Sequence, residues 1–388
     1  MVRSTVAPAT GVPLPSAAVE ELRRLLRAAL TVDAGAAPAA ARDPHVPAAE
    51  LLAAARRHRV EIALAPHAAT LGCADAEVEA LARASRAQRV AAMRLVAQVH
   101  QVQAALEAAG VPALFIKGPV LAAQTTGDPL ARGGGDVDVW VAPNSVARAQ
   151  EALIPLGLQP RAAYPVPTEP AAWRLMIATM YETPLIAPAW AVDLHWHLDY
   201  NRAGLPSFEE AWQRRIEVDL LGRTVSTLGL ADALDHSCRH AAKDGHAWLR
   251  SLLDVHRLDL LTRGTRTTRT TRRPVTRRTV EVARALLAPE PEPASGPSRA
   301  PSRAVRRAVR HHERDWPRRY PLGVGELVHL AQRLAGAGSL GDVVRDLALI
   351  ALPPRALGGV RTRSLPLAVA WALWLRLRRV GRGVSPER

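Results

Sequence analysis

Two aspartates stand one residue apart in the run Asp136-Val137-Asp138-Val139-Trp140-Val141, directly after the three glycines at 133–135. In an extended strand, alternate side chains point to the same face, so both carboxylates would share one face and the valines the other. Two like charges this close repel, and the pKa of one carboxyl rises unless a positive charge lies between them. The spacing therefore predicts a site for a divalent cation, Mg²⁺ or alternatively Mn²⁺, both of which favour carboxylate oxygens.

A second candidate segment lies upstream, where Val111–Ile116 predicts a short apolar strand and Lys117-Gly118-Pro119 a turn that opens a helix. A turn of this kind offers backbone N–H groups and the positive end of a helix dipole, which suit a phosphate. Lys117 is one of two lysines in a chain with 51 lysines and arginines, which indicates a specific need for a compact ammonium group. Arg132, four residues before Asp136, would offer a guanidinium fork to a phosphate oxygen.

A third segment, Ala191–Leu198, predicts another strand with Asp193, His195 and His197 on one face. Asp193 would supply a third carboxylate. His195 has two readings of equal weight: a base or acceptor-orienting group, and a hydrogen-bonded core histidine.

Taken in order, Lys117-Gly118, Arg132, Asp136-Val137-Asp138 and Val192-Asp193-Leu194-His195-Trp196 resemble the motifs of a bacterial nucleotidyltransferase family within the superfamily related to DNA polymerase beta. The resemblance covers about residues 45–262 and implies an α+β fold, in which a small mixed β-sheet core is embedded in a mainly helical chain. In the wider superfamily a serine commonly accompanies the motif glycine; here Lys117 takes that neighbourhood.

The resemblance also implies roles for individual residues. Asp136 and Asp138 would be catalytic metal ligands, and Asp193 would complete the metal site and help to deprotonate the acceptor. The nucleotide would be bound by the remaining motif residues and one lysine of the helical follow-on: Lys117, Gly118, Arg132, His195 and Lys243.

The implied reaction moves a nucleoside monophosphate from a nucleoside triphosphate to a hydroxyl acceptor and releases pyrophosphate. The acceptor stays open among a small molecule, a peptide and RNA. Two alternatives accompany this reading. One is a catalytically silent nucleotide- or RNA-binding accessory protein of the same fold, and the other is a toxin that modifies hydroxyls of tRNA or protein.

The net charge of +15 would suit nucleic acid, but an arginine-favouring coding bias explains it better. Two cysteines, Cys73 and Cys238, give neither a disulfide framework nor zinc spacing, which favours a reducing, cytoplasmic setting. No secretory signal and no transmembrane segment is expected. The apolar stretch Leu365–Leu375 is about half a membrane span, and a packed terminal helix explains it better than a membrane-surface helix.

Along the chain we expect six parts. They are a Pro/Ala-rich segment with one helix (1–46), a helical lead-in whose main helix is capped by Asp75 (47–110), the αβ core (111–200), a helical follow-on (201–262), a Thr/Arg- and Pro-rich loop or linker (263–302), and a C-terminal helical module (303–388). The Arg/Thr tract at 263–278 has a second reading as an arm that binds RNA. His236, His240 and His246 lack the pattern of a zinc site and are expected on a helix packed against the core.

Overall fold

The computed structural model describes residues 14–38, 42–161, 164–200, 202, 204–263, 273–288 and 302–313, together with a few positions between 362 and 374. The middle of the Arg/Thr tract (264–272), the Pro-rich stretch at 289–301 and most of the C-terminal module lie outside the described residues. The expectations for these segments, including the terminal helix, therefore stay predictions.

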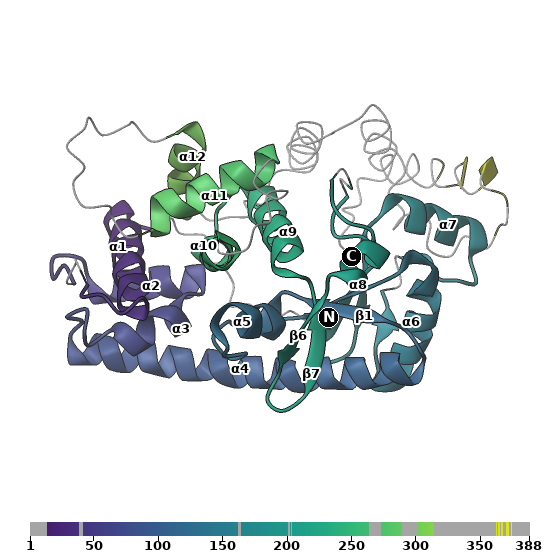
Figure 1. Cartoon of the computed structure of the whole chain (residues 1–388), viewed down its shortest axis with the longest axis horizontal. Helices are drawn as coiled ribbons and strands as arrows, with labels where there is room; N and C mark the ends of the chain where they lie inside the picture. Colours follow the sequence, from purple (N-terminus) through teal and green to yellow (C-terminus); the bar gives the residue numbers. More distant parts are fainter. Residues whose placement is uncertain are drawn as a thin grey trace.

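The described helices precede, interrupt and follow a single sheet (Figure 1). They are α1 (Ser16–Asp33), α2 (Ala48–His58), α3 (Glu61–Leu64), α4 (Asp75–Ala108), α5 (Gly118–Thr126), α6 (Val146–Leu153), α7 (Pro170–Thr179), α8 (Phe208–Gln213), α9 (Leu230–Lys243), α10 (Leu249–Arg263), α11 (Pro274–Leu287) and α12 (Arg303–Glu313), with short 3-10 turns at Ala65–His67, Pro143–Ser145 and Ile154–Leu156. No helix in this part of the chain has the length and apolar character needed to cross a membrane.

The sheet has seven strands in the order β3-β4-β5-β2-β1-β7-β6. Their bounds are β1 (Ala113–Ile116), β2 (Val137–Val141), β3 (Gln159–Pro160), β4 (Glu182–Ile186), β5 (Ala191–His195), β6 (Ile216–Asp219) and β7 (Thr224–Thr227). The β2–β5 and β1–β7 pairs are parallel and the other four pairs are antiparallel, so the sheet is mixed. The expected α+β architecture, a mixed sheet within a mainly helical chain, is confirmed.

The two faces of the central strands meet different surroundings. Val137, Val139 and Val141 of β2 join one apolar cluster with residues of α4, α6 and β5. Trp140 points the other way and joins the second cluster, where its ring meets that of Phe208 edge-on at a centroid distance of 5.5 Å. Asp138 alternates with the valines and so shares the face of Trp140. The helices on this second face therefore surround the end of β2 that carries the carboxylates.

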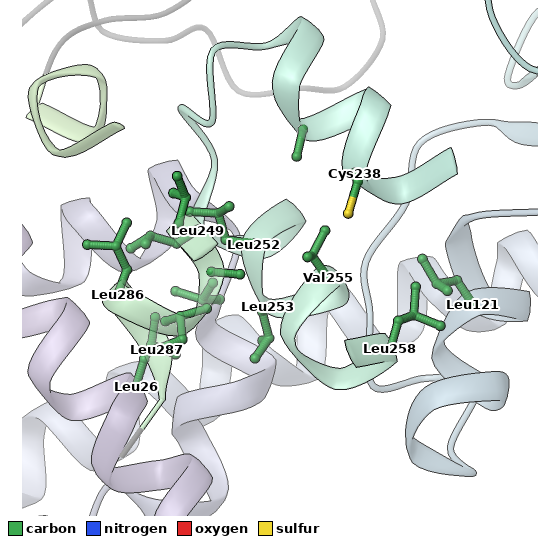
Figure 2. Packing of buried hydrophobic residues seen from close by; sticks show 14 of the residues in the cluster. Leu26, Leu121, Cys238, Leu249, Leu252, Leu253, Val255, Leu258, Leu286 and Leu287 are labelled. Atoms are coloured by element: carbon green, nitrogen blue, oxygen red, sulfur yellow. The ribbon is translucent and has the colours of Figure 1, made fainter. Parts of the chain in front are cut away.

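The second cluster unites helices from both ends of the described chain. Figure 2 shows leucines of α1, α5, α10 and α11 around Val255, with Cys238 of α9 beside them. The long helix α4, of 34 residues, contacts α2 and α3 near its start and α5 and α6 farther along, and Figure 1 shows it running along one side of the molecule. Helices far apart in the sequence thus form one support for the sheet.

Three local expectations are wrong. Helices were expected throughout 208–261, but β6 and β7 form a hairpin there; Ile216, Val218 and Val225 alternate with polar residues, which is the period of a strand. Residues 274–287 were expected in a linker, yet they form α11, because their apolar residues recur at helical spacing and bury one face. Asp75 is the first residue of α4 and not its cap, since the cap position is Ala74 and the side chain of Glu77 accepts a hydrogen bond from the Ala74 N–H.

Candidate active site

Asp138 and Asp193 lie side by side on the parallel strands β2 and β5. The two residues are direct partners in the strand register, and Val137 pairs with Val192 in the same way. Adjacent strands are about 4.8 Å apart, and paired residues point to the same face. Asp136 lies two residues before Asp138, directly ahead of β2. The fold therefore brings Asp138 and Asp193 together on neighbouring strands, and Asp136 precedes this pair in the loop before β2.

A fourth carboxylate, Glu182 at the start of β4, belongs to the same group. In the antiparallel register Glu182 is the partner of His195, and Pro184 is the partner of Asp193. The His195 ring lies between two acids: its Nε2 is 3.1 Å from Oδ1 of Asp138 and its Nδ1 is 3.2 Å from Oε2 of Glu182. The ring is thus hydrogen-bonded to Asp138 through Nε2 and faces the Glu182 carboxylate with its other nitrogen.

Lys117 reaches the same group from the end of β1. Its Nζ donates a hydrogen bond of 2.6 Å to Oδ1 of Asp138, the oxygen that also faces His195. The sequence predicted a lysine that meets a phosphate, whereas the structure pairs this lysine with a carboxylate. In the structure the ammonium group thus supplies the positive charge that the Asp-x-Asp pattern requires.

The backbone at Lys117 is strained. It has φ 62° and ψ −163°, a combination that is almost confined to glycine, and Gly118 follows with φ 50°. A non-glycine residue held in this way costs about 1–3 kcal/mol, and such residues concentrate at functional sites. The strain places the Lys117 side chain over Asp138 at the point where α5 begins, with Pro119 in its first turn.

The crowding of like charges changes the pKa values of these acids. Burial, reinforced by Glu182 and Asp138 and opposed by His195, raises the pKa of Asp193 to about 7. Desolvation and the Asp138 charge also raise the pKa of Asp136. Burial would raise the pKa of Asp138 too, but the Lys117 ammonium and His195 outweigh it and hold the pKa well below its usual range. One carboxylate is therefore compensated and two are not.

The carboxylate oxygens are suitable ligands for a divalent cation, and paired residues of β2 and β5 direct them to one face of the sheet. They are not already gathered around a cation site in the described structure. Within the described ranges, no three His, Cys, Asp or Glu side chains are gathered closely enough to hold a metal ion. The pKa of Asp193 is nevertheless raised by its acidic neighbours, a repulsion that a cation among them would relieve. Asp136, Asp138 and Asp193 are the residues that would hold it.

Arg132, in the loop before β2, is fixed by another helix. Its Nε donates to both oxygens of Asp254 on α10, at 3.0 and 2.9 Å, and both side chains are buried. A small cavity of about 10 Å³ lies between Lys117 and Arg132, and His236 of α9 also lines it. Both cations that were predicted to meet a phosphate thus border one cavity next to the carboxylates.

Comparison with known proteins agrees with this geometry. The model of a family described as uncharacterised nucleotidyltransferases matches residues 44–266, more than half of the chain. The chain belongs to this nucleotidyltransferase family. No curated protein and no solved structure matches it. The substrate class is therefore a nucleotide, and the family match covers every residue of the acidic group and of the cavity.

The other predicted residues lie around this nucleotidyltransferase site without joining the carboxylates. Lys243, at the end of α9, donates a hydrogen bond of 2.8 Å to the hydroxyl of Tyr181, whose ring is 6.0 Å from that of His195. His236 and His240 line the cavity beside Lys117, whereas His246 pairs with Thr279. His236 and His240 lie on α9, as expected, whereas His246 was expected on a helix and lies instead in the turn between α9 and α10.

Three residues near the site were not predicted. Glu182 stands in a strand whose other residues carry no chemical motif, and only its pairing with His195 brings it to the acids. Arg250 donates from Nη1 to the Gly133 carbonyl at 2.9 Å, and Arg59 ends α2 in a left-handed conformation. In a chain so rich in arginine, nothing in the sequence distinguishes these two arginines from the others. The one available signal was the placement of Arg250 one helical turn before Asp254.

Proposed function

We propose that this nucleotidyltransferase moves a nucleoside monophosphate from a nucleoside triphosphate to a hydroxyl acceptor, releases pyrophosphate, and depends on Mg²⁺ or Mn²⁺. The observation that carries the proposal is the direct register pairing of Asp138 with Asp193, with Asp136 two residues away. Adjacent carboxylates on neighbouring strands suit a divalent-metal site better than any role in sheet stability, because like charges directly opposite each other destabilise a sheet. The narrower likeness to polymerase beta, drawn from the ordered motifs, belongs to this proposal.

In this transfer reaction the residues of the site have separate roles. The acceptor hydroxyl oxygen attacks the α-phosphorus, the bond between that phosphorus and the bridging oxygen breaks, and pyrophosphate leaves with those electrons. Asp193 accepts the hydroxyl proton, from a position directly beside Asp138 in the strand register. Asp136 and Asp138 would hold the metal, with Asp193 completing the set. A cation held there would supply charge stabilisation for the phosphate oxygens.

Lys117 has a second state in this scheme. In the structure its ammonium compensates Asp138; with a cation held by the aspartates, this compensation would no longer be needed and the ammonium could turn to the phosphates. Gly118 and the start of α5 offer their N–H groups to the same phosphates, because the first residues of a helix have no intrahelical acceptors. Arg132 and His195 orient the nucleotide and the Asp138 carboxylate, and Lys243 contacts the nucleotide from α9.

The decisive test uses triphosphates labelled at the α- or the γ-phosphate, incubated with the protein, Mg²⁺ and a cell extract. We expect the α-label on an acceptor and the γ-label in pyrophosphate. Asp138→Asn should lower transfer by about a thousandfold or more, because the isosteric amide keeps the volume but loses the charge. Asp219→Asn, on the exposed outer strand β6, is the matched control and should transfer normally. Transfer of the γ-label, or undiminished transfer by Asp138→Asn, would refute the proposal.

A catalytically silent nucleotide-binding protein is the second candidate, and the Lys117–Asp138 pair favours it, because an ammonium already holds the key carboxylate. Calorimetry with ATP and Mg²⁺ followed by the labelling assay separates the two, since a silent protein binds without turnover. Binding of RNA through the Arg/Thr tract also remains a proposal. Since α10 ends at Arg263 and α11 begins at Pro274, the deletion that tests it should remove 264–272 alone.

A further inference from the structure

A group of three arginines lies beside the candidate active site, where the charge of Asp136 acts on two of them. Arg132 and Arg250 clamp the loop before β2 onto α10: Arg132 donates to Asp254 on α10, and Arg250 of α10 donates to the Gly133 carbonyl of the loop. The two contacts lie one helical turn apart on α10 and converge on neighbouring loop residues. Both guanidinium groups are therefore fixed within a few residues of Asp136.

Arg59 completes this group, which we call the arginine cluster (Arg59, Arg132 and Arg250). The charges of Arg132 and Asp136 both act on the Arg59 guanidinium, and burial together with Arg132 lowers its pKa. Burial, Arg132 and Arg59 likewise lower the pKa of Arg250 to about 9, while Asp254 and Asp136 oppose that change. Each arginine is thus close enough to the other two to feel their repulsion.

The arginine cluster is short of acceptors. Among the described residues, the Arg59 side chain has neither a hydrogen bond nor an ion pair, and the Arg132 guanidinium donates only through its Nε. The Nε of Arg250 is buried without a hydrogen-bond partner in the same part of the chain. A buried donor without an acceptor costs about 1–3 kcal/mol, so such an arrangement is expected where a ligand supplies the acceptors.

The charge balance identifies the class of ligand. Among the described residues, Asp254 is the one carboxylate that is hydrogen-bonded to the arginine cluster, so three guanidinium groups share one bonded acid, while Asp136 and Glu61 act on the cluster through their charges alone. Guanidinium forks match phosphate oxygens in geometry and bind them through paired hydrogen bonds. Arg132 of the cluster lines one small cavity together with Lys117, the lysine that donates to Asp138.

We infer that Arg59 and Arg250, together with Arg132, bind the β- and γ-phosphates of the nucleoside triphosphate and retain the pyrophosphate as it leaves. This inference rests on the proposed function and deepens it, since it assigns the two terminal phosphates to helices α2 and α10 outside the sheet. The acidic residues then act on the α-phosphate and the acceptor, and the arginine cluster binds the pyrophosphate leaving group.

Inorganic tripolyphosphate is the probe, titrated by calorimetry in EDTA so that neither metal nor transfer contributes. We expect the wild type to bind tripolyphosphate, and Arg59→Gln to weaken this binding at least about tenfold, the loss expected for charge-assisted hydrogen bonds. Arg59→Gln is the sharper variant, because no contact of the folded protein is removed with it. Arg83→Gln, which removes an exposed arginine of α4, is the matched control and should bind like the wild type.

Arg250→Lys provides the second measurement, because it keeps the charge but loses the fork. It should also weaken tripolyphosphate, with the melting temperature recorded to show that the Gly133 loop is retained. Failure of the wild type to bind tripolyphosphate, or equal binding by wild type, Arg59→Gln and Arg250→Lys, would overturn the inference. Failure of the proposed function looks different: arginine-dependent binding of tripolyphosphate would persist while no labelled monophosphate reaches any acceptor.

Discussion

The end of the sheet and the helical side of the molecule bury ionisable groups in opposite ways. On the helical side two buried acids have matched donors: Asp259 accepts from Arg263 and Arg284 at 2.6 to 2.8 Å, and Asp235 accepts from Thr276 at 2.6 Å as well as from Arg273. The bonds from Arg284 and Arg263 outweigh burial and lower the pKa of Asp259. Charge there is compensated, as a stable interior requires.

At the end of the sheet the charges are only partly compensated. Lys117 and His195 both serve Asp138, whereas Asp193 and Asp136 have no ion-pair partner among the described residues. Since the same chain compensates Asp259 with two arginines, the imbalance at the sheet is not a general property of its folding. Local departures from good packing and pairing are expected at functional sites, where a ligand completes the arrangement.

The largest effect is expected from Asp193→Asn, which removes an ionisable group from the crowded acids at the end of the sheet. The folded protein holds a proton on Asp193 up to about pH 7, whereas the unfolded chain releases it near the ordinary value of 3.8. Stability of the metal-free protein therefore falls as the pH rises from about 4 to 7, and the loss is complete above pH 7. Asp193→Asn cannot ionise, so at pH 8 it should melt about 3–8 °C higher than the wild type, while transfer is abolished.

The measurement is a series of thermal melts in EDTA from pH 4 to pH 8. The difference between Asp193→Asn and the wild type should be close to zero at pH 4 and grow to a plateau above pH 7. Asp219→Asn, whose carboxylate is exposed on β6, should show no such growth. A difference that is independent of pH would mean that Asp193 is not crowded by its acidic neighbours.

The second prediction concerns the compensated region. Asp259→Asn should lower the free energy of unfolding by about 1–3 kcal/mol, because two arginines lose a charged acceptor; both are about half exposed, which limits the cost. Urea unfolding measures the loss, and Glu79→Gln, in an exposed pair on α4, should change stability by less than about 1 kcal/mol. Transfer by folded Asp259→Asn should equal that of the wild type; reduced transfer would show that the two regions are not separate.

The same contrast explains which parts of the site were predictable from the sequence. Asp138 and Asp193 stand in strands whose alternation assigns their side chains to one face, so their meeting required only that β2 and β5 be neighbours, and Asp136 directly precedes β2. Glu182, Arg59 and Arg250 depend on contacts between segments that are distant in the sequence. No local period reports such contacts, and an arginine-rich composition conceals the two arginines further.

The fold divides in the same manner. Strong apolar periodicity predicted the helix at Ala17–Leu30 and the central strands, which the structure contains as α1, β1, β2 and β5. The hairpin β6–β7 was missed because its strands are only four residues long and lie between helices. Helix α11 was not predicted, because the Thr/Arg-rich residues before it led us to assign the whole segment to a loop or linker. Val280, Ala283 and Leu287 nevertheless repeat at helical spacing.

The smallest expected effect concerns the strained backbone of one residue, Lys117. Lys117→Ala and Lys117→Gly both remove the ammonium from Asp138, so both should lose transfer to the same extent. They differ in the backbone, because glycine adopts φ 62° and ψ −163° without the penalty that alanine retains. Lys117→Gly should therefore be more stable than Lys117→Ala by about 1 kcal/mol in urea unfolding, even though glycine gains more entropy when the chain unfolds.

Ala123→Gly, inside α5, is the control, and there the glycine variant should be less stable than the protein with alanine. Equal stability of the two Lys117 variants would mean that the backbone at this position carries no strain, and the argument for function would then depend on the charges alone.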